Sequence, residues 1–284
     1  MSSSGCDNSF QPLKKNSDYA FSIYGVLDAS ADTQWVRVSP PSDQLATPAE
    51  KPAMTVTLEE LETGKIATMN DSLFTQDGDP RFVNTWTTME IRNGHTYRLR
   101  AIDAEGKESR VTVTIPEPFP TPTLRREFGI GMPTTFTMFV DSMNHLADVH
   151  VEWFVRLTAP GFEEERVVSF AYRNRAEERF DGEFRVFIEP EKDQEEILQQ
   201  TFLPSDGGEV EVLHRQVVIA SGGPEWNPDI ATSDELIYAL PDGFSNVENG
   251  LGYLIGVDTK RIPLKSCRDE NSLLIPCPEE EPFW

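Results

Sequence analysis

Residues 93–116 read NGHTYRLRAIDAEGKESRVTVTIP, and this stretch indicates the fold class. Asn93-Gly94 is a signal for a tight turn, and Glu105-Gly106 is a second one. The segments 95–102 and 110–115, which follow these turns, alternate apolar with polar side chains. A period of two residues is typical of a β-strand with one buried face. The stretch therefore predicts two antiparallel strands joined in a hairpin.

Short alternating segments separated by turn signals begin at Asp18 and continue to residue 117. They predict about seven strands with turns every 8 to 12 residues, which is typical of a small antiparallel sandwich. The hairpin at residues 93–116 resembles the last hairpin of a fibronectin-type-III or immunoglobulin-like module. We therefore expect residues 18–117 to form an immunoglobulin-like β-sandwich, a fold that by itself says little about function.

A proline-rich segment marks the predicted domain boundary. Four prolines alternate with other residues in PEPFPTP, and we expect a stiff linker at residues 118–122. Residues 123–284 then show further alternating segments, above all 149–157. Helical character is confined to 192–202 and 233–240. The chain is predicted to be all-β, with a second, mostly antiparallel β domain that holds one or two short helices.

The charge of the chain limits the classes of partner that it can bind. The 284 residues include 48 acidic and 25 basic side chains, which gives a net charge of −23. Such a field repels nucleic acid, so we expect no nucleic-acid partner. No run of about 18 apolar residues is present, so we expect no membrane-spanning helix. The N-terminus carries no apolar segment, so the signal peptide is incomplete in this chain.

No motif in the sequence predicts a reaction. A G-x-S-x-G nucleophile motif and a glycine-rich phosphate loop are both missing. The four histidines are scattered and lack metal-ligand spacing. Paired carboxylates are abundant, but charge runs of this kind are usually solvated. We expect a protein that is not an enzyme and that needs no metal or cofactor, with a hydrolase that has an acidic cleft as the less favoured alternative.

The three cysteines indicate a protein exported from the cytoplasm. Ser3-Ser4-Gly5 precede Cys6, as small residues precede the acylated cysteine of bacterial lipoproteins, and residues 7–17 form a polar tether. The alternative is a disordered polar tail with an incidental cysteine. Cys267 and Cys277 enclose nine residues, and in an exported protein we predict that they form a disulfide. Closing so short a loop would add at most about 2–3 kcal/mol.

Two aromatic residues near the C-terminus are candidates for a protein contact. Trp226 and Phe244 lie among polar and turn-forming neighbours, in EWNP and DGFS. Aromatic side chains in such loops are good anchors because they bury a large area with few rotatable bonds. We predict that at least one of them is substantially exposed and contacts a partner. The alternative is that both belong to the core of the second domain.

The C-terminal part also carries a family resemblance. The segment FSNVENGLGY at 244–253, the cysteines 267 and 277 and the final Pro-Phe-Trp resemble a family of Bacteroidota surface lipoproteins with a domain of unknown function (the four-two-four-nine family). The resemblance implies an outer-membrane or cell-surface lipoprotein that is membrane-anchored through Cys6. It further implies a TonB-dependent transporter as a possible partner, and it implies no catalytic residues.

The sequence thus predicts a non-enzymatic binding or accessory module. The alternative is an extracellular adhesion or carbohydrate-binding β-sandwich protein. A row of exposed aromatic side chains would favour this alternative. A broad apolar patch on the C-terminal domain would favour a transporter partner. A deep pocket lined by paired carboxylates would favour the hydrolase.

Overall fold

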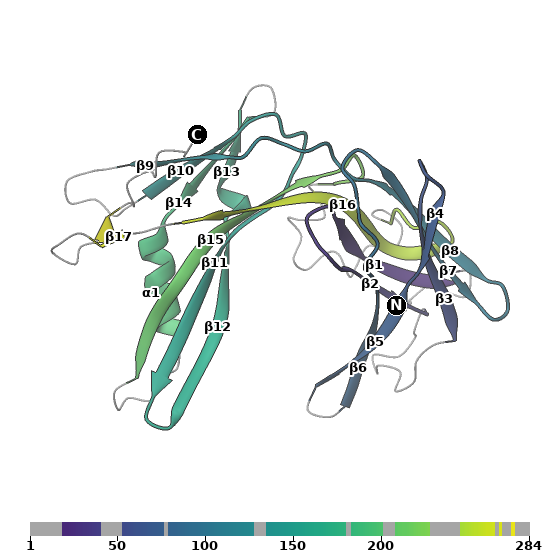
Figure 1. Cartoon of the computed structure of the whole chain (residues 1–284), viewed down its shortest axis with the longest axis horizontal. Helices are drawn as coiled ribbons and strands as arrows, with labels where there is room; N and C mark the ends of the chain where they lie inside the picture. Colours follow the sequence, from purple (N-terminus) through teal and green to yellow (C-terminus); the bar gives the residue numbers. More distant parts are fainter. Residues whose placement is uncertain are drawn as a thin grey trace, which may run out of the picture.

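The structure of the chain is a computed structural model that describes residues 19–40, 53–76, 79–127, 135–179, 183–200, 208–227, 245–264, 267–268 and 274–275. The fold is all-β, as the sequence predicts. Figure 1 shows two β-rich lobes that stand like the legs of an arch and are joined at the top by long strands.

The first lobe is the predicted β-sandwich. One layer contains β1 (Phe21–Asp28), β2 (Gln34–Ser39), β5 (Asn70–Gln76) and β6 (Asp79–Thr87). The other layer has the order β4-β3-β7-β8, with β3 (Met54–Glu60), β4 (Lys65–Thr68), β7 (Thr96–Asp103) and β8 (Glu108–Thr114). The hairpin β7–β8 confirms the alternation, because its apolar positions are buried between the layers: Tyr97, Leu99, Ala101, Val111 and Val113.

The second lobe packs a small sheet and one helix on three long strands. The long strands are β11 (Leu146–Ala159), β12 (Phe162–Ala171) and β15 (Glu209–Gly222). The small sheet has the order β13-β14-β10-β9, with β9 (Thr123–Glu127), β10 (Thr135–Val140), β13 (Ala176–Glu178) and β14 (Phe184–Ile188). The predicted helix at 192–202 is α1 (Pro190–Gln200), whereas 233–240 lies outside the described residues. β15 has an irregularity where its pairing with β11 shifts register, between Phe154 and Val155.

A buried polar group attaches α1 to the long strands. The carboxylate of Asp193, on the helix, accepts a hydrogen bond of 2.6 Å from the Tyr172 hydroxyl and one of 3.3 Å from Trp153 Nε1. All three residues are buried, and burial raises the pKa of Asp193. A buried polar group is costly unless it is hydrogen-bonded, so this arrangement specifies the position of the helix.

Strand β16 (Gly250–Pro263) joins the two lobes into one sheet. Its first half runs parallel to β1, from Phe21↔Gly250 to Asp28↔Val257, and its second half runs antiparallel to β15. The result is an eight-stranded sheet of order β12-β11-β15-β16-β1-β2-β6-β5. The sequence assigns β16 to the second domain, but Val247 and Leu254 pack in the core of the first sandwich. The two predicted domains therefore share a strand.

The proline-rich linker is also part of this junction. Ile115 packs in the first core, and Phe119, four residues further on, packs in the second. Lys260 of β16 lies over the Phe119 ring at 4.7 Å and donates a hydrogen bond to its carbonyl oxygen. The segment connects two cores that lie next to each other, and it is packed against the sheet.

The parallel pairing of β16 with β1 generates a testable prediction about Gly252. This residue has a φ of +114°, and a Cβ there would lie 2.0 Å from the carbonyl oxygen of Ile23. We expect Gly252→Ala to lower the free energy of unfolding by more than about 3 kcal/mol, or to prevent folding, because the backbone of β1 must move.

Gly161→Ala is the matched control for this variant. Gly161 has a φ of +79°, but nothing lies within 4 Å of its Cβ position. The Gly161→Ala variant should lose only about 1–2 kcal/mol of its free energy of unfolding, which is the cost of a left-handed backbone conformation for alanine. Urea unfolding of both variants measures the difference, and equal losses would contradict the tight approach of β16 to β1.

Candidate functional site

The eight-stranded sheet has one covered face and one open face. Leu254 packs in the first core and Ile262 packs against the second. These two residues of β16 are an even number of positions apart, so they lie on the same face of the strand. Both small sheets therefore cover the same face of the large sheet. We call the opposite face the open face.

The open face carries a row of aromatic side chains on the first lobe. Trp35 of β2 lies opposite Trp86 of β6, with ring centroids 5.9 Å apart. Trp35 also contacts Phe74 of β5 edge to face, at 5.8 Å. Tyr24 of β1 adds a fourth ring, one rung along the sheet from Trp35. We call these four residues the aromatic row.

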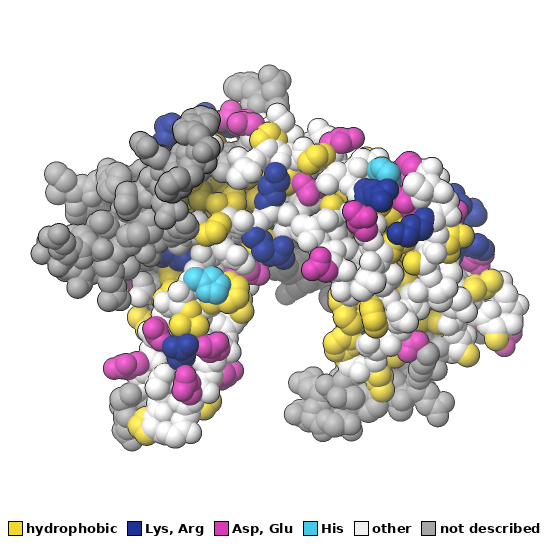
Figure 2. Space-filling model, viewed as in Figure 1, with side chains coloured by type: hydrophobic (Ala, Val, Ile, Leu, Met, Phe, Trp, Pro, Cys, Tyr) yellow, Lys and Arg dark blue, Asp and Glu magenta, His cyan; other side chains and the backbone are white. Residues whose placement is uncertain are grey.

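The aromatic row is exposed. Trp35 is 42% exposed, Tyr24 45% and Phe74 37%, whereas Trp86 is half-buried. Figure 2 shows hydrophobic side chains on the side of the first lobe that borders the gap of the arch, where β2, β5 and β6 lie. Large aromatic rings gathered on a solvent-exposed sheet indicate a binding surface, since burying them against a ligand is favourable.

Polar side chains accompany the aromatic row. Arg37 lies opposite Asn84 on the neighbouring rung, and its Nε is 3.5 Å from the Asn84 side-chain oxygen. The indole nitrogen of Trp86 donates a hydrogen bond of 3.1 Å to the hydroxyl of Ser72. Planar amide and guanidinium groups beside exposed rings can orient a ligand that carries both apolar faces and hydroxyl groups.

The open face of the second lobe is charged. Arg156 forms ion pairs with three carboxylates, those of Glu163, Glu165 and Glu211. Figure 2 shows such a group of acidic side chains around a basic one on this lobe. These pairs connect β12, β11 and β15, so they follow from cross-strand neighbours of opposite charge. Glu163 and Glu165, which belong to one of the acidic runs in the sequence, therefore lie on this surface.

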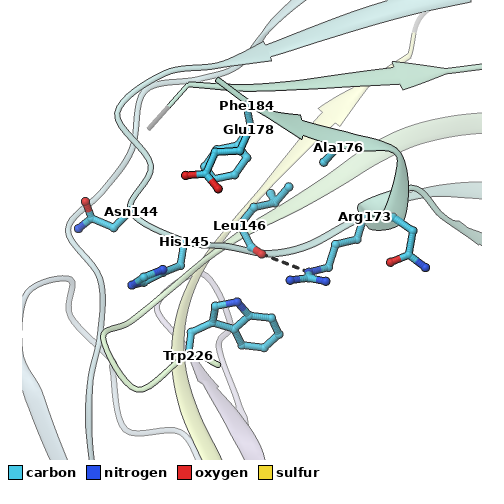
Figure 3. A pocket seen from close by; sticks show the side chains of 9 residues that line it. Asn144, His145, Leu146, Arg173, Ala176, Glu178, Phe184 and Trp226 are labelled. Atoms are coloured by element: carbon cyan, nitrogen blue, oxygen red, sulfur yellow. Dashed lines mark hydrogen bonds between the residues drawn. The ribbon is translucent and has the colours of Figure 1, made fainter. Parts of the chain in front are cut away.

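A pocket of about 490 Å³ lies in the second lobe close to the junction of the lobes. Its walls include Trp226, Arg173, His145, Asn144, Glu178 and Phe184. Figure 3 shows Arg173 and His145 on opposite sides of it, with the indole of Trp226 between and below them. Among the described residues that line the pocket, Glu178 is the single carboxylate, so they do not provide the carboxylate pair that a glycoside hydrolase would need.

Trp226 is held by contacts to both lobes. Its amide donates a hydrogen bond to the carbonyl oxygen of Gly223, which closes a turn. The amide of Gly223 in turn donates a hydrogen bond to the carbonyl oxygen of Gly256 in β16. The neighbouring Glu225 accepts a hydrogen bond of 3.1 Å from the amide of Thr114 in the first lobe. Trp226 is half-buried and packs on a small cluster formed by Ala147, Ala220, Ile255 and Val257.

The other predicted site residues lie largely outside the described part of the chain. Cys6, Phe244 and Cys277 are not among the described residues. Cys267 is in β17 (Cys267–Arg268), where it pairs with Ile275 of β18 (Leu274–Ile275). The disulfide, the lipid anchor and the docking role of Trp226 and Phe244 stay predictions. Sequence reasoning missed the aromatic row.

Two further findings concern the described residues alone. None of their helices is long and apolar enough to cross a membrane. Their His, Cys, Asp and Glu side chains form no group of three or more that could hold a metal ion.

The chain matches no protein-family model and no curated protein. Among solved structures, it is similar to a pullulanase from Anoxybacillus sp. LM18-11, with 12% identity and a TM-score of 0.22. That alignment covers 70% of this chain and 24% of the pullulanase. It is also similar to the FN1–FN3 domains of chicken CNTN1, with 8% identity and a TM-score of 0.26, over 85% of this chain and 62% of the other. TM-scores this low carry no argument about function.

The charged end of the open face generates a prediction about pH. His150 lies on β11 between Asp148, at 2.7 Å, and Glu152, at 3.4 Å. The hydrogen bond to Asp148 raises the pKa of His150 above its usual value. A histidine whose pKa is higher in the folded state stabilises the fold below about pH 6.5, and this contribution is lost as the pH rises through the folded pKa.

We therefore expect His150→Gln to lower the free energy of unfolding by roughly 0.5–1 kcal/mol near pH 6 and by less near pH 9. Asp148→Asn, which removes the main hydrogen-bond acceptor, should reduce the same pH dependence. Urea unfolding at both pH values measures it. A loss for His150→Gln that is equal at the two pH values would show that the charge on His150 does not stabilise the fold.

Proposed function

We propose that the protein is a non-enzymatic binding protein of a bacterial surface, and that the aromatic row binds the sugar rings of a glycan. The observation that carries this proposal is the group of exposed rings Tyr24, Trp35, Phe74 and Trp86 on the open face of the sheet. The carbohydrate-binding alternative of the sequence analysis is thus the one that the geometry favours.

The chemistry of a glycan suits this surface. A pyranose ring presents a face of C–H groups that packs against an aromatic ring, and it presents hydroxyl groups at its edge. Arg37 and Asn84 lie one rung from Trp35 and Trp86, where they can bond to such hydroxyls. A neutral glycan also avoids the repulsion that the net charge of −23 exerts on an anionic polymer.

The position of the row on strands supports binding without large rearrangement. Its four rings are carried by β1, β2, β5 and β6, which are paired side by side in the sheet. Valines 36 and 38, on the opposite face of β2, are buried in the core, so the strand that presents Trp35 is fixed. A surface that is already ordered loses little conformational entropy when a ligand binds.

The location of the protein is a separate part of the proposal. The lipid anchor at Cys6 and the TonB-dependent transporter partner rest on the sequence resemblance and on the small residues before Cys6. An anchored glycan-binding protein would hold polysaccharide near a transporter, so the two parts are compatible. The surface location and the glycan can nevertheless be tested independently.

Substitutions in the aromatic row test the binding function. We expect the protein to be retarded in affinity gels by at least one polysaccharide from a panel of neutral plant, fungal and bacterial glycans. Trp35→Ala and Trp86→Ala should each weaken this binding about tenfold, since losing one aromatic contact costs about 1–2 kcal/mol. Isothermal titration with an oligosaccharide of the retarding glycan gives the fold-change.

Phe162→Ala is the matched control for the two tryptophan variants. Phe162 is an aromatic residue that is 45% exposed, but it lies on β12 at the far edge of the sheet. It should bind as the wild type does. Unchanged binding by both tryptophan variants, or binding to none of the glycans, would contradict the proposal.

The lipid anchor is tested by the mass of the native protein. We expect a mature chain that begins at Cys6 and carries two or three acyl chains, because a single chain holds a membrane only marginally. Cys6→Ser should move the protein from the membrane fraction to the soluble fraction. A native chain that retains Met1 without lipid would rule out the anchor.

A further inference from the structure

The pocket at Trp226 is a site distinct from the aromatic row. It is formed by the loop before β11, by the 3-10 turn Arg173–Arg175 after β12, by β13 and β14, and by the turn that carries Trp226. The aromatic row is carried by strands of the first lobe, whereas the described residues that line the pocket belong to the second half of the chain. A ligand of the pocket therefore has to be inferred separately from the ligand of the aromatic row.

Arg173 is the unusual residue of the pocket. Its guanidinium lies over the indole of Trp226, with Cζ 5.2 Å from the ring centroid. Its Nε donates a hydrogen bond of 3.2 Å to the carbonyl oxygen of Leu146. Within the described part of the chain, its two Nη atoms have neither a hydrogen-bond acceptor nor an ion-pair partner. By contrast, the guanidinium groups of Arg100, Arg156, Arg166 and Arg175 are all paired with glutamates.

The position of Arg173 is fixed before any ligand arrives. The preceding residue, Tyr172, is fully buried and donates its hydroxyl proton to Asp193. The Tyr172 amide donates to the carbonyl of Val149, and the Arg175 amide donates to the carbonyl of Tyr172. Burial lowers the pKa of Arg173, which reflects the partial desolvation of its charge. Among the described residues, the negative charge of Asp148 acts on Arg173 electrostatically but forms no ion pair with it. An immobilised, partly desolvated guanidinium whose Nη donors are not used by a carboxylate is favourable for binding an anion.

The other walls indicate what kind of anion fits. Trp226, Phe184 and Leu146 provide apolar surface, and His145 and Asn144 lie across the pocket from Arg173 (Figure 3). Glu178 is also part of the wall, so the pocket suits a ligand with a single negative charge better than a multiply charged one. A volume of about 490 Å³ is in the range of small-molecule sites, which usually combine apolar walls with a few polar groups.

We propose that this pocket binds a small organic monocarboxylate with an apolar ring or chain. The carboxylate accepts two parallel hydrogen bonds from the Nη atoms of Arg173, the geometry in which guanidinium binds carboxylate most strongly. The ring or chain of the ligand packs on Phe184 and on the exposed edge of Trp226. The contact with the indole of Trp226 restricts the movement of the guanidinium.

Two matched pairs of probes test this proposal on the full-length protein. Cyclohexanecarboxylate and glucuronate carry the acid group, and cyclohexanecarboxamide and glucose are their neutral counterparts. Saturation-transfer NMR with competition measures their affinities. We expect at least one acid to bind with a Kd below about 10 mM and at least tenfold more tightly than its neutral counterpart.

Variants of Arg173 assign this binding to the pocket. Arg173→Gln should weaken the acid at least tenfold, and Arg173→Lys, which keeps the charge but not the paired donors, should weaken it less. Arg175→Gln is the matched control, because Arg175 belongs to the same turn but pairs with Glu189 and does not line the pocket. Its acid binding should equal that of the wild type. Thermal unfolding checks that each variant folds. If Arg173→Gln does not fold, Arg173→Lys is the variant that tests the proposal.

Several results would overturn the proposal. These are equal binding of acid and neutral probes, no binding of either acid up to about 10 mM, or unchanged acid binding by the folded Arg173 variants. The result does not depend on the glycan-binding function, because Trp35→Ala should bind the acids as the wild type does.

Discussion

The pairing of β16 with two different neighbours is the interaction on which the rest of the structure depends. Its first half lies parallel to β1 and its second half antiparallel to β15, so one strand belongs to both lobes. The approach is close: a Cβ at Gly252 would meet the backbone of Ile23, and one at Gly256 would lie 2.6 Å from the carbonyl of Thr114. The glycines of β16 therefore permit the contact between strand and sandwich. The first lobe is complete only when the C-terminal part of the chain is in place.

This shared strand determines where ligands can bind. Because both small sheets cover the same face of the large sheet, the opposite face is available over both lobes, except at Ile255 and Val257 of β16, where Trp226 packs on it. Trp35 and Trp86 make one end of it aromatic, and Arg156 with its glutamates makes the other end charged. The turn that carries Trp226 is also fixed by the shared strand, since Gly223 bonds to Gly256 and Tyr253 donates a hydrogen bond to the carbonyl of Glu225. The aromatic row and the pocket thus both depend on β16.

The two proposed sites use different forces. The aromatic row would gain affinity from the burial of apolar surface, which acts irrespective of the net charge. The Arg173 pocket must bind an anion to a chain with a net charge of −23. Charges beyond a distance of about 8–10 Å are screened at physiological salt, whereas a paired contact at hydrogen-bond distance is not. A short-range, partly desolvated guanidinium can therefore bind a carboxylate that the overall field disfavours.

The sequence by itself determined the local structure. Alternation predicted the hairpin β7–β8 and the strand β11, because period and turn chemistry are properties of neighbouring residues. The sequence could not predict that Trp86 and Phe74 would join Trp35, or that Arg173 would lie on Trp226, since the residues in these pairs are 39 to 53 positions apart. Only the tertiary structure decided these groupings, together with the return of β16 to β1. The reason is that the backbone hydrogen bonds that pair strands are the same for every sequence, so the choice of neighbour depends on how the whole core packs.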